Sequence, residues 1–200
     1  PLDAYKNWPS YAEEIEVALL TQPLKRYQLF NVTKAAWDPT DPQTAVTTAQ
    51  TVLRYTVVGT NDVITLNGGE NPYNNIGTVY KGSFNDWALN REVERVDGNP
   101  AYFFEYYETT GALSRPLVTM HTMSDGAVPF RHEMVYYDKV RSQGAARHLT
   151  VIPVMRYGHC TFEAEEILGA FAWLFIKVHM TEGWQLMPYM QELPMPMPMP

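Results

Sequence analysis

A strand–helix–strand pattern near the C-terminal end constrains the fold of this 200-residue chain most. Residues 117–122 form a short apolar run that ends at the turn Ser124-Asp125-Gly126, as a buried strand does. Residues 132–143 carry apolar side chains at helical spacing, and residues 148–155 form a second apolar run. The pattern therefore predicts a βαβ unit, whose crossover connection makes the two strands parallel.

Two candidate catalytic side chains follow the predicted strands. Asp125 comes after the first strand, and His159 lies in the loop after the second. Ligands of open α/β sheets bind outside the carboxyl ends of parallel strands, which lie about 5 Å apart when adjacent. A carboxylate that accepts the Nδ1 proton of a histidine leaves Nε2 free to act as a general base. We therefore expect Asp125 and His159 to meet, whereas the alternative acid Asp138 lies in the middle of the predicted helix.

The residues around this pair resemble a known superfamily. The segment PLVTMHTMSDGAVP, followed by RYGHC and an apolar helix, is similar to the C-terminal half of α/β-hydrolases. The nearest match is to secreted bacterial members with a helical insertion before the acid strand, strongest over residues 106–178 and looser over residues 52–90. In these enzymes the triad runs in the order Ser, Asp, His. The resemblance implies a serine hydrolase, an esterase or peptidase acting on a small ester or amide through an acyl-enzyme, with Asp125 as acid and His159 as base.

The nucleophile of this superfamily is missing from the chain. No G-x-S-x-G motif occurs, in which the nucleophilic serine stands on a strained strand-to-helix turn. Only Ser83 lies between a possible strand and a possible helix, but the bulky Lys81 and Asn85 flank it, so we interpret Ser83 as a helix N-cap. We therefore expect the serine to lie outside these residues, in a missing N-terminal segment or a second chain, and this chain alone to be inactive.

The resemblance also implies an organisation of the chain. The fold class would be α/β, a partial α/β-hydrolase fold that contains the last parallel strands of the sheet with their flanking helices. Residues 1–110 would form a mostly helical insertion, or lid, and residues 111–182 the C-terminal part of the hydrolase core. Residues 183–200, which end in LPMPMPMP, form a low-complexity tail that cannot build a packed core.

Within the insertion, local signals place several helices. Asp41 as N-cap and Pro42 as first helical residue begin a helix that we expect to end near Val58, before a separate short segment at residues 61–66. Residues 101–108 form a strongly aromatic helix. Such a helix either packs into the core or forms the wall of a hydrophobic groove.

The region after the second strand offers two further candidates for chemistry. Cys160 follows His159, but catalytic Cys and His come together in space rather than in sequence, so we interpret Cys160 as buried and inert. Glu163 lies four residues after His159, yet no third metal ligand is evident, and we expect neither a metal nor another cofactor. Residues 162–178 should form a final helix that packs on the sheet through an apolar face of Ile167, Phe171, Leu174 and Phe175.

Composition limits the partners. The net charge of −7 and the lack of a basic cluster argue against nucleic acid and against an anionic membrane surface. The longest apolar run, residues 167–176, is shorter than the roughly 20 residues of a membrane span. Localisation stays open, because the resemblance implies secretion whereas the sequence shows no signal peptide. A non-enzymatic alternative also stays open, namely a relic or binding subunit whose aromatic region holds a partner or an apolar ligand.

Overall fold

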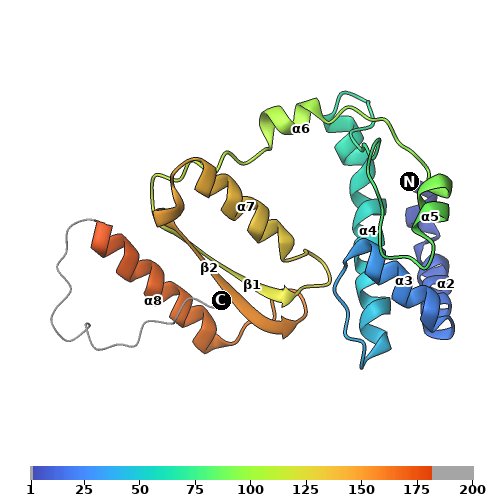
Figure 1. The fold of residues 1–200 in the computed structure, drawn as a ribbon, viewed down its shortest axis with the longest axis horizontal. Helices are drawn as coiled ribbons and strands as arrows, with labels where there is room; N and C mark the ends of the chain where they lie inside the picture. The colour runs from blue at the N-terminus through green and yellow to red at the C-terminus, as the bar shows by residue number, and fades with distance from the viewer. Residues whose placement is uncertain (1, 182–200) are drawn as a thin grey trace.

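The computed structural model describes residues 2–181 and shows a mixed α/β fold (Figure 1). Its elements, in chain order, are α1 (Leu2–Lys6), α2 (Trp8–Thr21), α3 (Pro23–Thr33), α4 (Pro42–Leu66), α5 (Asp86–Glu92), α6 (Ala101–Tyr106), β1 (Leu117–Ser124), α7 (Arg131–Ser142), the 3₁₀ helix η1 (Ala146–His148), β2 (Leu149–Tyr157) and α8 (Ala164–Thr181). The predicted tail, residues 183–200, lies outside the described residues.

The βαβ unit predicted from the sequence is confirmed. Strands β1 and β2 pair in parallel, with Leu117 opposite Leu149 and a shift of register before Ser124 pairs with Tyr157. Helix α7 connects them, and its ends lie within two residues of the predicted ones. Because the strands run parallel, the loops that carry the two candidate side chains leave the same end of the sheet.

Helices α7 and α8 cover opposite faces of the two strands, which lie between them in Figure 1. Val151 packs with the fully buried Val140 of α7. The preceding residue, Thr150, accepts hydrogen bonds from Trp173 Nε1 (3.3 Å) and Lys177 Nζ (2.8 Å) of α8. Successive side chains of a strand point to opposite faces, so each strand contacts one helix on each side.

The N-terminal region is helical and has its own small core. Leu19 of α2, Phe30 of α3 and Val46 of α4 are buried together. Asp41 caps α4 by accepting a hydrogen bond from the Gln43 N–H (3.0 Å), as predicted. The expected end near Val58 is wrong, because α4 continues without a break to Leu66. No proline interrupts this stretch, and its single glycine weakens a helix by only about 1 kcal/mol relative to alanine.

The segment from Asn67 to Pro100 is mostly irregular, and asparagine side chains hold it together. Asn90 donates to the carbonyls of Tyr80 (2.6 Å) and Asp86 (2.7 Å) and accepts from the Tyr80 N–H (2.8 Å). The predicted capping role of Ser83 is wrong. Asn85 caps α5 instead, and the Ser83 hydroxyl donates to Asp86 (2.8 Å).

Two expectations about apolar packing are also wrong. Helix α6 buries none of its side chains, so the core-packing interpretation of the aromatic segment fails; Phe104 and Tyr106 are exposed. In α8 the expected contact face is largely exposed at Phe171 and Phe175, and the sheet meets Trp173 instead. Apolar residues surround this helix on several sides, so their spacing alone does not choose the buried face.

Helix α4 docks beside the carboxyl end of the sheet. The Tyr157 hydroxyl, at the end of β2, donates to the Thr44 carbonyl (3.0 Å) and shares a hydrogen bond of 2.9 Å with Thr48 Oγ1. Gly126 lies against the Thr48 hydroxyl, since a Cβ atom at position 126 would stand only 2.2 Å from Thr48 Oγ1. A glycine is therefore required where the Asp125 loop meets α4.

A candidate catalytic pair at the strand ends

The structure brings the two predicted side chains together. His159 Nδ1 lies 2.8 Å from Asp125 Oδ2. The Asp125 side chain is 3% exposed, whereas that of His159 is 49% exposed. A buried carboxylate thus orients an imidazole whose other edge faces outward, which is the arrangement of an acid–base pair open to a substrate.

The surroundings of Asp125 keep its carboxyl group ionised. Burial on its own would raise the pKa, but hydrogen bonds from the Val128 N–H, from His159 and from the Ala127 N–H outweigh it, and the pKa lies below the ordinary value. The two backbone donors bind Oδ1 at 2.8 Å (Ala127) and 2.9 Å (Val128), leaving Oδ2 for the imidazole. An ionised carboxylate only accepts hydrogen bonds, so Nδ1 carries a proton, and in the neutral form of the ring the lone pair is on Nε2.

Direct bonds to β1 fix the loop that carries His159. The Gly158 N–H donates to the Ser124 carbonyl (3.2 Å), and the buried Thr122 hydroxyl donates to the Gly158 carbonyl (2.5 Å). Gly158 has a φ of +113°, which strongly favours glycine. Both hydrogen bonds join Gly158 to β1, the strand that Asp125 follows, so the loops bearing the pair are tied to each other.

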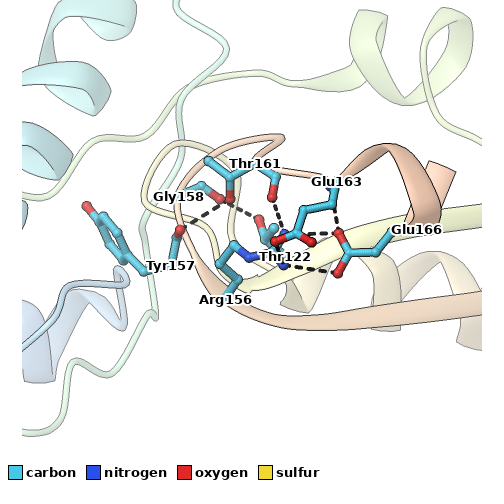
Figure 2. Close-up of polar contacts among 7 residues, drawn as sticks. All are labelled: Thr122, Arg156, Tyr157, Gly158, Thr161, Glu163 and Glu166. Carbon is cyan, nitrogen blue, oxygen red and sulfur yellow. Dashed lines mark hydrogen bonds and ion pairs between the residues drawn. The ribbon is translucent and has the colours of Figure 1, made fainter.

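Arg156 also holds the loop that carries His159, because it binds residues that follow this loop in the chain (Figure 2). Arg156, near the end of β2, donates to Glu163 Oε1 (3.0 Å), to both carboxylate oxygens of Glu166 (2.9 and 3.1 Å) and to the Thr161 carbonyl. The Glu166 bonds raise the pKa of Arg156, and the same bonds lower the pKa of Glu166. The network joins β2 to the start of α8 across the turn that holds His159.

This network was not predicted from the sequence, although a signal was present. Two glutamates stand three residues apart at the start of the last helix, and Arg156 precedes the first by seven residues. Glu166, the third residue of α8, also accepts a hydrogen bond from the Glu163 N–H (2.8 Å), as the glutamate of a capping box does. An arginine just before a turn and a capping box just after it form a pattern that predicts a closed loop.

Cys160 is exposed, so the expectation that it is buried is wrong. Gly158 and Cys160 both have positive φ, and the tight turn they form lies at the surface. The Cys160 sulfur is 3.7 Å from Nε2 and 4.0 Å from Nδ1 of His159. A partner in line with the Nε2 lone pair would lie much farther from Nδ1 than from Nε2. The thiol therefore does not occupy the direction in which Nε2 would accept a proton.

The rest of the described chain adds no metal chemistry to the pair. Within residues 2–181, no group of three or more His, Cys, Asp and Glu side chains could hold a metal ion. No helix in that part of the chain is both long and apolar enough to cross a membrane.

Comparison with protein-family models, with curated proteins and with solved structures found no match to this chain. The function is therefore inferred from the residues and their geometry.

Proposed function

We propose that Asp125 and His159 are the acid and the base of a Ser–Asp–His triad in an ester or amide hydrolase whose serine lies outside these 200 residues. One observation carries the proposal, the 2.8 Å hydrogen bond between a buried carboxylate and Nδ1 of a half-exposed imidazole. The pair stands at the carboxyl ends of two parallel strands, where α/β proteins place their chemistry.

In this proposal Nε2 of His159 takes the proton of the serine hydroxyl as the serine oxygen attacks the substrate carbonyl. Asp125 stabilises the imidazolium that forms. The imidazolium then gives the proton to the leaving alcohol or amine, and an acyl-enzyme remains. A water molecule, deprotonated by the same Nε2, releases the acid and restores the serine. Asp125 stays ionised throughout, in keeping with its lowered pKa.

The surface around the pair supports a nucleophile supplied from outside. Within residues 2–181 the sheet has only two strands, and both outer edges are open. Two-stranded sheets are marginally stable by themselves. Helix α8 exposes an apolar group that consists of Ile167, Leu168, Phe171 and Phe175. A strand and a helix that carry the serine would extend the sheet and cover this apolar group. Large exposed apolar patches commonly mark surfaces that another part of a protein covers.

A fluorophosphonate probe, which reacts with activated serines, tests the proposal. The 200-residue chain and a form extended upstream of Pro1 are treated side by side. We expect labelling of the extended form alone, and loss of that labelling after His159→Gln. If the extended form is not labelled, intact mass of the native protein tells whether a second chain accompanies it. An unlabelled extended form without a second chain contradicts the proposal.

A binding subunit is the second candidate, favoured by the exposed aromatic side chains of the α6 region, Phe104, Tyr106 and Tyr107. In that case a partner or an apolar ligand covers these rings and the catalytic pair is a relic. The His159→Ala substitution should then leave partner or ligand binding unchanged. Loss of function on the same substitution would contradict this second candidate.

A further inference from the structure

The turn that carries His159 has an uncommon backbone. Gly158 has a φ of +113° and Cys160 a φ of +53°, so φ is positive on both sides of His159. Glycine adopts such angles readily, whereas for a residue such as cysteine they are uncommon and costly. A strained backbone persists only where the surrounding structure holds it in place. The turn therefore depends on contacts from outside it, and the position of His159 depends on the turn.

Arg156 closes this turn by binding residues on its far side, as Figure 2 shows. Its guanidinium group donates to the Thr161 carbonyl and to Glu163 Oε1 (3.0 Å). It also binds both carboxylate oxygens of Glu166, at 2.9 and 3.1 Å. A fork of this kind fixes the direction of the guanidinium group as well as adding energy. One side chain therefore ties the residue three positions before His159 to three residues that follow it.

The start of α8 is held without Arg156. Glu166 accepts a hydrogen bond from the Glu163 N–H (2.8 Å) and so caps the helix from within. Another side-chain bond crosses the turn, from the Thr161 hydroxyl to the Tyr157 carbonyl (3.2 Å), but both of its groups are neutral. Hydrogen bonds to a charged group are roughly twice as strong as neutral ones. What the arginine adds is therefore a charged tie across the turn rather than a support for the helix.

We propose that Arg156 is a positioning residue for the catalytic pair. By closing the strained turn, it keeps Nδ1 of His159 within hydrogen-bond distance of Asp125, at 2.8 Å. None of the hydrogen bonds that Arg156 makes within residues 2–181 goes to either member of the pair, so it acts through the backbone of the turn. The assignment rests on the proposed hydrolase function, because it gives Arg156 a part in the same reaction. A misplacement of about 1 Å at a reacting group can lower a rate about 100-fold.

The ring nitrogens of His159 report the position of the imidazole without any nucleophile. The 200-residue chain is labelled with ¹⁵N-histidine, and two-bond ¹H–¹⁵N spectra are recorded at about pH 8, above the ordinary imidazole pKa of about 6.5. The His159→Gln variant identifies the signals of His159. In the wild type we expect the neutral ring to carry its proton on Nδ1, because the ionised Asp125 carboxylate only accepts hydrogen bonds. In Arg156→Met we expect a mixture of the two tautomers, since the bond to Asp125 no longer selects one.

Two further variants separate this role from a general loss of stability. Lys139→Met breaks an ion pair with Glu108 that involves neither loop of the pair, and it should leave the His159 tautomer unchanged. Arg156→Lys keeps the positive charge but not the fork, so it should behave like Arg156→Met, and it serves if that variant does not fold. Amide spectra show in each case whether β1 and β2 are intact.

Relief of the strain should compensate for the missing arginine. Asparagine tolerates the left-handed conformation better than cysteine does, so Cys160→Asn makes the turn less dependent on outside contacts. Added to Arg156→Met, it should restore part of the Nδ1–H form of His159. Added to the wild type, it should change the tautomer little. No recovery in the double variant would contradict a role of Arg156 in holding the strained turn.

The extended form adds a kinetic readout. There Arg156→Met should lower kcat about 10- to 100-fold and leave KM within about twofold, because the arginine acts on the pair rather than on binding. A raised KM with an unchanged kcat would place Arg156 in substrate binding and overturn the positioning role.

The two proposals fail in different ways. An unchanged His159 tautomer in Arg156→Met, an equal change in Lys139→Met, or a wild-type ring with its proton on Nε2 would overturn the positioning role. Fluorophosphonate labelling of the extended form would then leave the hydrolase proposal standing. The expected tautomer changes, together with an unlabelled extended form, would overturn the hydrolase proposal and leave Arg156 as the residue that positions the pair.

Discussion

The strand-end loops and the segment between α4 and α6 are both irregular, but different interactions hold them. At the strand ends, two loops are fixed by the pairing of β1 with β2 and by a buried carboxylate that binds two backbone N–H groups. In the segment from Asn67 to Pro100, single amide side chains reach across to the backbone, as Asn75 does to Glu94 (2.9 Å) and Val96 (2.7 Å). Regular pairing places the candidate catalytic groups, whereas scattered amides only close a loop.

The two regions also differ in the charge of the groups that form their hydrogen bonds. The strand-end loops concentrate charge, with Asp125 buried against His159 and Arg156 bound to two glutamates. The asparagine-held segment uses mainly neutral donors and acceptors. Ionised groups that are desolvated respond strongly to pH and to substitution, and neutral amides do not titrate. Substitutions in the two regions should therefore have effects of different kind and size.

The largest effect is expected for activity. If the proposed function is correct, His159→Ala in the extended form should lower kcat/KM by about 10⁴-fold, as disabling a triad histidine does. The same substitution should also lower the free energy of unfolding by about 1–3 kcal/mol, because it removes one hydrogen bond from the buried Asp125 carboxylate. Asn90→Ala, in the other region, is the control and should keep kcat/KM within a few-fold of wild type. Equal losses of activity in both variants would contradict the contrast between the regions.

The next effect is on stability and depends on pH. Asp125→Asn should lower the free energy of unfolding by about 1.5–3 kcal/mol at pH 7, since hydrogen bonds to a charged group are lost. The pKa of Asp125 is lower in the folded protein than its ordinary value. Its ionisation therefore stabilises the fold above the unfolded pKa of about 3.9, and this contribution disappears as the pH falls through the folded pKa.

Urea unfolding at pH 7, 5 and 3.5 checks this dependence. The difference between wild type and Asp125→Asn should be the same at the two higher values and should shrink at the lowest. Asp138→Asn, at an exposed position of α7, is the control and should lie within about 0.5 kcal/mol of wild type. A difference for Asp125→Asn that does not vary with pH would show that its charge has no part in stability.

The same contrast explains what could be predicted from the sequence. Period and turn signals predicted β1, α7 and β2 to within two residues, and parallel pairing then implied that Asp125 and His159 meet. The bounds of these elements and the parallel pairing follow from local residue periodicity, turn residues and the geometry of a βαβ connection, so the sequence pattern is enough to predict them. The Asn85 cap and the uninterrupted α4 are local features for which the sequence signals favoured the wrong alternative, whereas the exposure of α6 depends on the absence of long-range contacts. No local pattern contains that information, and Cys160 and the buried face of α8 were misassigned for the same reason.

A smaller and local effect is expected in the asparagine-held segment. Asn90→Ala removes three hydrogen bonds, to Tyr80 and Asp86, and should lower stability by about 1–2 kcal/mol. Amide hydrogen exchange should quicken between residues 78 and 96 while β1 and β2 keep their protection, because no strand residue contributes to these bonds. Asn74→Ala is the control with a weaker effect, because it also removes three hydrogen bonds but at an exposed position. Faster exchange in the strands would mean that the two regions unfold together.

The smallest effect concerns α4, which links the two regions. Gly59 lies in the interior of this helix, and a Cβ atom there would meet nothing within 4 Å. Gly59→Ala should therefore raise the free energy of unfolding by about 0.5–1 kcal/mol, measured by urea denaturation. Gly126→Ala makes the same change where a Cβ would stand 2.2 Å from Thr48 Oγ1, and should destabilise. A loss of stability in Gly59→Ala would indicate that α4 bends or ends near Gly59, as the sequence pattern first predicted.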